Sequence, residues 1–140
     1  MRTALLNKVQ VLSFPKLSDQ RGDLSVIESN NQIPFNIKRI FYIYNISSAK
    51  TRGAHAHKEL EQVLIAIAGN FEVKVDDGFE KKSFHLSKPW QGLYIPPMVW
   101  NTLNDFSSAA VCLVLASDFF EETDYYRDYK EFIKNVTDSK

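Results

Sequence analysis

The chain reads Thr51-Arg52-Gly53-Ala54-His55-Ala56-His57-Lys58 at the point that decides its fold. Two of its three histidines lie in this stretch, two residues apart. If the segment is extended, alternate side chains leave the same face of the strand, so the two imidazoles share a face with their roots roughly 7 Å apart. The pair could hold one metal ion, flank one substrate, or simply fill space in the core.

The rest of the chain is a series of short β-rich segments separated by turns. Asp76-Asp77-Gly78 predicts a hairpin turn, and Gly69-Asn70 predicts a two-residue hairpin loop. Residues 63–68 and 109–115 are apolar on both faces, so we expect them at the centre of a sheet that is covered on both sides. Along residues 71–76 charged residues alternate with apolar ones, which predicts a strand with one solvent-exposed face. The predicted strands are Lys8–Ser13, Leu24–Glu28, Ile37–Asn45, Gln62–Ala68, Phe71–Asp76, Lys81–Leu86, Gly92–Ile95, Trp100–Leu103 and Ala109–Ala116. Many short strands with regular turns indicate an all-β sandwich or small barrel.

Only the tail of the chain predicts a helix, over Glu121–Asn135. Its apolar residues recur at spacings of three and four, which places them on one face of a helix. We expect this face to pack on the β-structure or on a second subunit rather than to bind a cofactor. The face consists of Tyr125, Tyr126, Tyr129, Phe132, Ile133 and Val136.

Length and composition exclude several classes of protein. At 140 residues the chain is expected to form a single domain, 1–140. A formal net charge of zero removes the electrostatic case for nucleic acid or a membrane surface as the main partner. Cys112 is the one cysteine, so no intrachain disulfide is possible, and its apolar neighbours predict a buried thiol. The N-terminus has no signal-peptide pattern and no apolar run is long enough to span a bilayer, so we expect a cytoplasmic protein.

A barrel that carries His-x-His resembles a cupin, in which two histidines, a glutamate and a later histidine bind a metal. In cupins a glycine follows the glutamate after six residues. Counting back from Gly69 puts Gln62 at the glutamate position. Glu61 could replace it only if the register slipped by one residue, which would turn it to the opposite strand face.

The later histidine is also replaced. The second cupin motif reads Pro96-Pro97-Met98-Val99-Trp100-Asn101, with Asn101 where the last histidine belongs. His85 lies on a different predicted strand and is expected to face solvent. Because amides are weak ligands for transition metals, this set favours a catalytic or substrate-binding role for the histidines without a metal.

Four motifs together resemble a particular family, the sugar 3,4-ketoisomerases, which are metal-free cupins that act on dTDP-4-oxo-6-deoxyglucose. The resemblance runs from about residue 8 to residue 132. It rests on Ser18-Asp19-Gln20-Arg21-Gly22-Asp23-Leu24, Pro34-Phe35-Asn36-Ile37-Lys38-Arg39-Ile40-Phe41-Tyr42, Arg52-Gly53-Ala54-His55-Ala56-His57-Lys58 and Gly92-Leu93-Tyr94-Ile95-Pro96-Pro97-Met98-Val99-Trp100.

The resemblance implies an all-β cupin jelly roll with a short C-terminal helix and no cofactor. It also implies a homodimer whose N-terminal strands are exchanged or paired between subunits, with a dTDP-linked 4-oxo-6-deoxy sugar in the mouth of each barrel. The pathway implied is deoxysugar biosynthesis for a lipopolysaccharide or S-layer glycan, in which a transaminase usually follows a 3-oxo sugar.

A 3,4-ketoisomerase needs a base near C3 and an acid near C4 of the sugar. We expect His55 to remove the C3 proton and His57 to return a proton or stabilise the enediolate, although the residues alone leave this division open. Arginines suit the pyrophosphate, and amides suit the sugar. Alternation along the strand means that Lys38 and Arg39 should not enter one pocket. The expected substrate contacts are Arg21, Lys38, Arg39, Tyr42, Tyr44, Arg52, Lys58, Gln62, Trp100 and Asn101, of which Tyr42 and Trp100 could equally be packing residues.

Three alternatives stay open. A metal-dependent cupin enzyme would contain stoichiometric metal linked to activity. A dTDP-sugar epimerase of related jelly-roll form would exchange hydrogen at C5 as well as C3. A non-catalytic nucleotide-sugar binding module would bind without exchange. The configuration at C4 of the product, galacto or gluco, is not settled by the motifs.

Overall fold

The computed structural model describes residues 5–47 and 49–138. Its regular elements are η1 Leu5–Lys8, β1 Gln10–Ser13, β2 Lys16–Asp19, β3 Gly22–Ser25, β4 Arg39–Ile43, β5 Arg52–His57, β6 Gln62–Ala68, β7 Phe71–Asp76, β8 Lys81–Leu86, β9 Gln91–Ile95, β10 Trp100–Asn104, β11 Val111–Ala116, η2 Glu122–Asp124, β12 Tyr125–Tyr126 and α1 Tyr129–Asp138.

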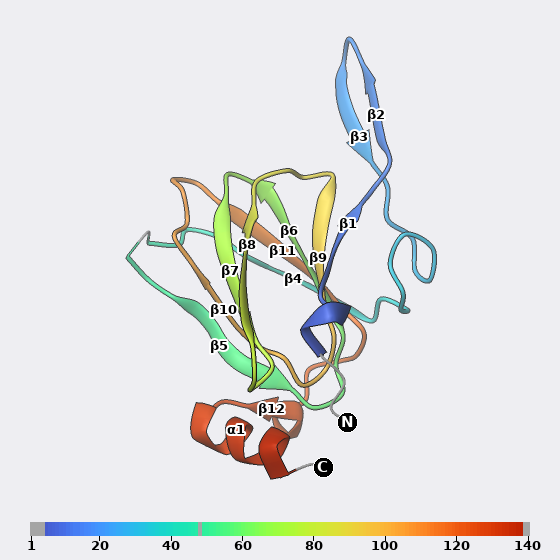
Figure 1. Cartoon of the computed structure of the whole chain (residues 1–140). Helices are drawn as coiled ribbons and strands as arrows, with labels where there is room; N and C mark the ends of the chain where they lie inside the picture. Colours follow the sequence, from blue (N-terminus) through green and yellow to red (C-terminus); the bar gives the residue numbers. More distant parts are fainter. Residues whose placement is uncertain (1–4, 48, 139–140) are drawn as a thin grey trace.

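Two five-stranded antiparallel sheets pack face to face (Figure 1). The first has the order β1-β9-β6-β11-β4 and the second the order β12-β5-β10-β7-β8, so most neighbours in a sheet are far apart along the chain. This is the predicted all-β jelly roll with a short C-terminal helix. As expected from their two apolar faces, β6 and β11 lie inside the first sheet.

The main core fills the space between the sheets. It is built from alternate residues of the central strands, such as Leu64, Val73 and Val114, which are at most 2% exposed. A second cluster covers the outer face of the first sheet, where Ile33 and Phe35 of the long β3–β4 connection pack on that sheet. The first sheet is therefore apolar on both faces over much of its area.

Strand prediction succeeds where apolar residues alternate or run continuously. β6, β7 and β8 have the predicted bounds, and β9 and β10 each extend one residue further. The strands β1, β4 and β11 are shorter than predicted, and Lys8, the first predicted residue of β1, belongs to η1 instead. The Asp76-Asp77-Gly78 hairpin joins β7 to β8 as expected.

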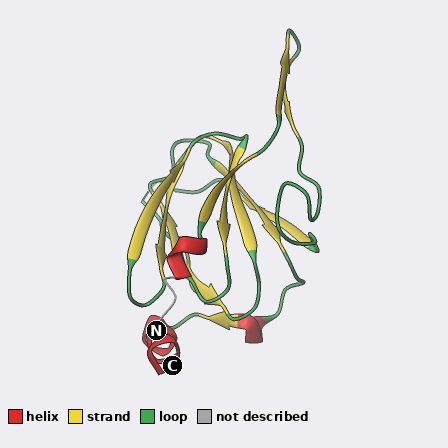
Figure 2. Ribbon diagram, turned by 45° about the vertical axis from the view of Figure 1, so that its right-hand side comes forward, coloured by secondary structure: helices red, strands yellow, loops and turns green. Residues whose placement is uncertain are grey.

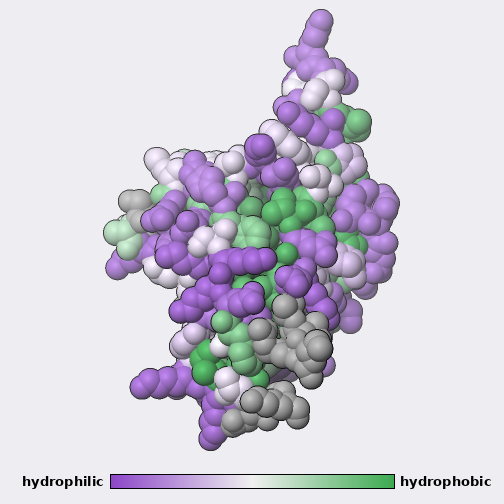
Figure 3. All heavy atoms as spheres, in the orientation of Figure 1, coloured by the Kyte–Doolittle hydropathy of each residue, from purple (hydrophilic) through white to green (hydrophobic). Residues whose placement is uncertain are grey.

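Two local predictions are wrong. Gly69-Asn70 does not form a hairpin, because β6 and β7 enter different sheets. The strand predicted at Leu24–Glu28 instead ends at Ser25, where β3 pairs with the unpredicted β2. The β2–β3 hairpin projects away from both sheets (Figures 1 and 2), and hydrophilic side chains cover most of it (Figure 3). Every residue of both strands is exposed, so neither strand needs the alternation of apolar and polar residues by which a half-buried strand is recognised in a sequence.

The tail is only partly the helix that was predicted over Glu121–Asn135. A short 3-10 turn, η2, is followed by β12, whose Tyr125 and Tyr126 pair with β5. Helix α1 begins only at Tyr129. Strand pairing with β5 outweighs the helical periodicity at the first two tyrosines.

Helix α1 packs on the outer face of the second sheet. The fully buried Phe132 contacts the Trp100 ring, with centroids 5.7 Å apart, and shares a cluster with Ala56 of β5. This confirms that the apolar face of the tail packs on the β-structure. Across 5–47 and 49–138, no helix is both long and apolar enough to cross a membrane.

Candidate active site

A bulge in β5 positions the histidine pair. Asn101 of β10 pairs with His55 but the next residue pairs with Gly53, so Ala54 is the extra residue. Gly53 and Ala54 have φ values of 82° and 61°. A Cβ on Gly53 would lie 3.1 Å from the backbone oxygen of Asn101, so the close approach of β5 and β10 requires glycine here. Bulges of this kind turn side chains toward a site.

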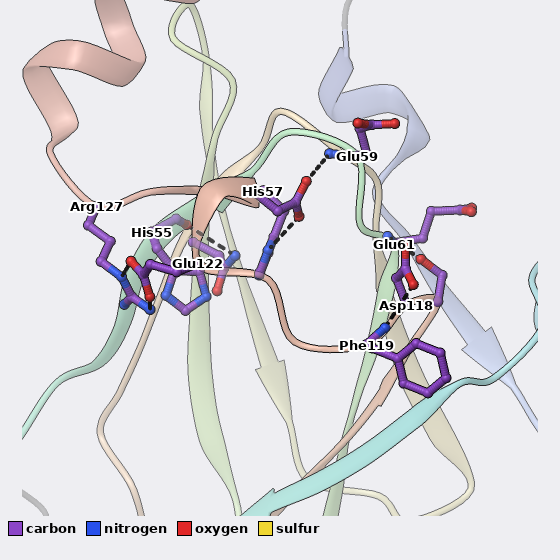
Figure 4. A network of polar contacts seen from close by, with 11 residues as sticks. His55, His57, Glu59, Glu61, Asp118, Phe119, Glu122 and Arg127 are labelled. Atoms are coloured by element: carbon purple, nitrogen blue, oxygen red, sulfur yellow. Dashed lines mark hydrogen bonds and ion pairs between the residues drawn. The ribbon is translucent and has the colours of Figure 1, made fainter.

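The two imidazoles lie side by side on the inner face of β5, as the alternation predicts (Figure 4). Their ring centroids are 5.0 Å apart in an edge-to-face arrangement. Ala56 between them faces the opposite way, into the cluster under α1. The histidines are thus directed between the sheets, while the intervening alanine anchors the strand to the helix.

His55 lies in the wall of a cavity of about 690 Å³ that residues of β4, β5, β6 and β10 help to line. Of the residues predicted from the sequence, six line this cavity. They are His55, Tyr42, Tyr44, Arg52, Gln62 and Asn101. The lining residues that sequence reasoning did not select include Lys50, Tyr125 and Arg127.

Gln62 and Asn101 occupy the interior positions that the motif spacing predicts. They are 4% and 2% exposed, and the Asn101 side-chain amide donates to the backbone oxygen of His55 at 3.4 Å. Glu61 faces away from the cavity and accepts a hydrogen bond from the Tyr94 hydroxyl at 2.7 Å. The register therefore places the amide, and not the neighbouring carboxylate, beside the histidines.

Burial controls the charge of the pair. It is the main cause that lowers the pKa of His55 to about 4, with smaller contributions from His57 and Arg127 and a small opposing one from the Gly53 backbone. Burial also lowers the pKa of His57, while Asp124 opposes that shift. His55 is consequently uncharged at neutral pH and can accept a proton.

The segment after β11 supplies groups that the sequence reasoning missed. The Asp124 carboxylate lies 3.2 Å from Nδ1 of His57. The Tyr125 ring lies against both imidazoles, with centroids 5.1 Å from His55 and 4.3 Å from His57. Arg127 pairs with Glu122 at 2.7 Å (Figure 4). The guanidinium carbon of Arg127 also lies 4.1 Å from the centre of the Tyr125 ring. The pairing of β12 with β5 brings these side chains to the site.

The remaining predicted contacts lie elsewhere. Arg39 and Lys58 line a smaller chamber beside His57. Lys38 is exposed, with its amine 5.9 Å from the centre of the Phe119 ring, and unlike Arg39 it lines neither the cavity nor the smaller chamber.

Two more predicted contacts are remote from the cavity. Trp100 packs under α1 on the outer face of the sheet and is absent from the cavity wall, so the structure supports its packing alternative. Arg21 stands at the tip of the β2–β3 hairpin with its side chain 90% exposed. His85 is exposed on β8 and Cys112 is fully buried, as predicted.

No group of three histidine, cysteine, aspartate or glutamate side chains is placed to hold a metal ion within the described ranges 5–47 and 49–138. The cavity that His55 lines also contains the amides of Gln62 and Asn101. Such amides suit hydrogen bonds to hydroxyl or carbonyl groups better than they suit a transition metal.

Comparison with known proteins gives a consistent result. A sequence model of the family described as "FdtA: WxcM-like, C-terminal" matches residues 7–137. The TDP-4-oxo-6-deoxy-alpha-D-glucose-3,4-oxoisomerase of Aneurinibacillus thermoaerophilus is 47% identical over 127 residues, which is 91% of each chain.

Solved structures agree with this match. A 3,4-ketoisomerase from Helicobacter canadensis aligns with a TM-score of 0.91 at 47% identity, covering 93% of this chain and 98% of that one. A histidine-to-asparagine mutant of the 3,4-ketoisomerase QdtA from Thermoanaerobacterium thermosaccharolyticum, in complex with TDP-4-keto-6-deoxyglucose, aligns with a TM-score of 0.91 at 40% identity, covering 93% and 94%. The chain therefore belongs to the FdtA family of WxcM-like, C-terminal proteins.

Proposed function

We propose that this protein is a sugar-nucleotide 3,4-ketoisomerase that converts dTDP-4-oxo-6-deoxyglucose to a dTDP-3-oxo-6-deoxyhexose. The relatives reported above carry this activity in their names, and one was solved with the 4-keto sugar nucleotide. The observation in this chain that carries the proposal is a partly buried His55, with a pKa lowered to about 4, in the wall of a cavity of about 690 Å³.

The reaction moves one proton between carbons and one between oxygens. The hydrogen on C3 is acidic because C3 is next to the C4 carbonyl. Removing it breaks the C3–H bond and leaves an enediolate across C3 and C4. Protonation at C4, with transfer of the C3 hydroxyl proton to the C4 oxygen, then leaves the carbonyl at C3. Acids and bases are sufficient for these steps.

His55 is the base that takes the C3 proton in this proposal. It lines the cavity, and its lowered pKa keeps it unprotonated at neutral pH. His57 lies behind it, with its ring centroid 5.0 Å away, and does not line the cavity. His57 is therefore assigned to proton transfer through His55 rather than to direct contact with the sugar.

The polar groups of the cavity divide between the two ends of the substrate. Gln62 and Asn101 lie deep in the barrel beside His55, where their amides can bond to the sugar oxygens. Arg52 and Lys50 lie in the same wall and carry the positive charge that a pyrophosphate requires. Tyr42 and Tyr44 stack on one another at 5.8 Å, more than half exposed, and offer a flat aromatic surface for the base.

A homodimer is part of the proposal. Arg21 is one of the predicted substrate contacts but lies on the projecting hairpin, outside the cavity of its own chain. The same hairpin exposes Leu17 and Leu24 at 61% and 55%. A second copy that covers these leucines would also bring Arg21 against a different subunit. The product, a 3-oxo sugar, is a substrate for an enzyme that adds an amine to a ketone.

The test is NMR of dTDP-4-oxo-6-deoxyglucose incubated with the protein in deuterium oxide. We expect a 3-oxo product labelled at C4, with the signal also reporting the C4 configuration. His55→Asn should lower turnover by about 100-fold or more. His85→Asn, the same change at an exposed histidine on β8, is the control and should keep wild-type turnover.

The outcomes separate the alternatives. Label at C5 as well as C3 would indicate an epimerase. Tight binding of the sugar nucleotide without any exchange would indicate a binding module. Full turnover by His55→Asn would remove this residue from the role of base.

A further inference from the structure

A groove on the outer face of the second sheet lies apart from the catalytic cavity. Its volume of about 520 Å³ is within the range of about 300–1,000 Å³ that small-molecule sites occupy. Alternation along β10 separates the two spaces, because Asn101 lines the catalytic cavity while Trp100 and Thr102 line this outer groove. The strands that form the outer groove, β10, β7 and β8, lie side by side above α1 (Figure 1). The polar residues that line it include Lys74, Lys81, Lys82, Ser83 and Thr102.

The register of β7 and β8 brings lysine side chains to one face. Lys74 pairs with Ser83, and Lys81 pairs with Asp76. Lys74 and Lys81 are therefore diagonal neighbours on the outer face, about 7–8 Å apart. Thr102 of β10 pairs with Lys74 and extends the same row. Two ammonium groups and two hydroxyls can thus reach one small anion between them.

Asp76 does not bind these lysine amines. It is the one acidic residue among the described residues that line the outer groove. Its Oδ1 accepts the Gly78 N–H at 2.7 Å, and its Oδ2 accepts the Tyr129 hydroxyl at 2.5 Å. The hydrogen bonds of the carboxylate therefore connect the β7–β8 turn to α1.

Ion pairing leaves most of the lysine charge unbalanced. Within residues 5–47 and 49–138, Lys81 and Lys82 form no ion pair, and the Lys74 amine lies 3.9 Å from Glu72, at the far limit of one. All three lysine side chains are exposed. The chain as a whole has no net charge, so these lysines produce a local positive field around the outer groove. Lysine amines bind phosphate oxygens as point charges.

We propose that the outer groove is a second binding site, which takes a diphosphate, either free or as part of a nucleoside diphosphate. Lys74 and Lys81 bind its oxygens from the sheet face, and Lys82 binds them from the edge strand. The hydroxyls of Ser83 and Thr102 donate to the same oxygens. A diphosphate spreads several negative charges over two linked groups, so it matches amines at this separation better than a single carboxylate does.

Trp100 provides the measurement, because it lines the outer groove and Trp90, the other tryptophan, does not. Trp90 lies instead beside Lys16, whose amine is 3.9 Å from the ring centre. In the ¹⁵N-labelled protein each indole N–H gives its own NMR signal, and Trp90→Phe assigns the two. The probe is inorganic pyrophosphate in about 0.15 M salt. We expect a saturable shift of the Trp100 signal.

Lys81→Gln combined with Lys82→Gln should weaken pyrophosphate binding at least about tenfold, because two charge-assisted contacts are lost. Lys130→Gln combined with Lys134→Gln is the matched control. It removes the same charge from exposed positions on α1 that do not line the outer groove, and it should keep wild-type affinity. Equal losses in both double variants would overturn the site, since net charge alone would explain them. A wild-type protein without a saturable Trp100 shift would also overturn it.

Activity separates this site from the catalytic cavity. Lys81→Gln combined with Lys82→Gln should keep kcat and KM for the sugar nucleotide within about twofold. A Trp100 shift that persists undiminished in this variant would arise from the cavity and would overturn the outer site. Repeating the titration with dTDP distinguishes the ligands: tighter binding than pyrophosphate indicates a nucleoside diphosphate, and equal affinity indicates the diphosphate alone. Absence of turnover by the wild-type protein would contradict the proposed function but not this site, since the titration needs no substrate.

Discussion

His55 and His57 share one strand face yet have different surroundings. His55 meets the larger cavity and the amides of Gln62 and Asn101, whereas the buried His57 meets Asp124 and the smaller chamber. Burial is the largest influence on the pKa of both. The two histidines are only two residues apart, yet His55 is suited to contact with the substrate and His57 to proton transfer.

The lowered pKa of His55 predicts the acid side of the activity profile. A histidine with an ordinary pKa of 6.5 would lose its ability to accept a proton below that pH. Since burial lowers the pKa of His55 to about 4, kcat/KM should stay nearly flat from neutral pH down to about pH 5 and fall below it. The measurement is kcat/KM between pH 4 and 8, with circular dichroism at each pH to verify folding. An acid limb centred near 6.5 would contradict the lowered pKa of His55.

The same shift has a consequence for stability. Between pH 6.5 and about 4, the unfolded chain binds a proton at His55 that the folded chain does not bind. The contribution of His55 to the free energy of unfolding is therefore largest above pH 6.5 and declines as the pH falls through this window.

At the scale of elements, the tail after β11 decides whether the site is complete. β12 continues the second sheet past β5 and places Tyr125 against both histidines. Helix α1 holds this strand in place through Phe132, whose ring lies 5.9 Å from that of Tyr126. The helix does not line the cavity, but it anchors the segment that does.

Phe132→Ala should therefore affect both stability and activity. Truncating a fully buried phenylalanine typically lowers the free energy of unfolding by about 3–5 kcal/mol. Phe119→Ala removes a phenylalanine that is 65% exposed and should change it by less than about 0.5 kcal/mol. Urea titration followed by fluorescence measures both. Similar losses in the two variants would contradict the anchoring role of α1.

Much of this arrangement could be predicted from sequence where a pattern is local. β6, β7 and β8 have alternating or continuous apolar residues, and their bounds were predicted without error. Gln62 and Asn101 were placed inside the barrel by counting from motif glycines and prolines. Local patterns do not predict β12. The spacing of apolar residues in the tail favours a helix, but Tyr125 and Tyr126 form a strand because they pair with β5, which is distant in the sequence.

The missed site residues share that cause. Asp124 lies 67 positions from His57 in the chain, and no spacing rule links the two. Tyr125 was interpreted as part of a helix face that packs on the barrel. Both residues reach the histidines only through β12–β5 pairing, which depends on the folded sheets.

At the scale of the whole molecule, the β2–β3 hairpin extends from the sheets at the end opposite α1 (Figure 1). Its cross-strand pair, Leu17 and Leu24, is exposed, as is Ile40 of β4. A two-stranded hairpin that covers no core is only marginally stable in water. A partner surface would explain why such an arm carries leucines.

The proposed homodimer predicts a mass in solution of about 32 kDa, twice the 16.1 kDa of one chain. Leu17→Asp combined with Leu24→Asp should shift the protein toward the monomer, because two charges would be buried without partners. Phe79→Asp changes an exposed residue in the β7–β8 turn, away from the arm, and should leave the mass unchanged. Sedimentation velocity measures all three proteins. A wild-type monomer, or a double variant that stays dimeric, would contradict the arm as an interface.

The order of elements along the chain has a consequence for how the protein is made. Every strand of the two sheets except β12 precedes residue 118, so a ribosome finishes the barrel before it adds Asp124 and Tyr125. Until that last segment emerges and pairs with β5, His57 lacks its carboxylate and both imidazoles lack the tyrosine that lies against them. Asp124 and Tyr125 thus join the site last, and catalytic competence in the way proposed appears only once their segment has been synthesised and has paired with β5.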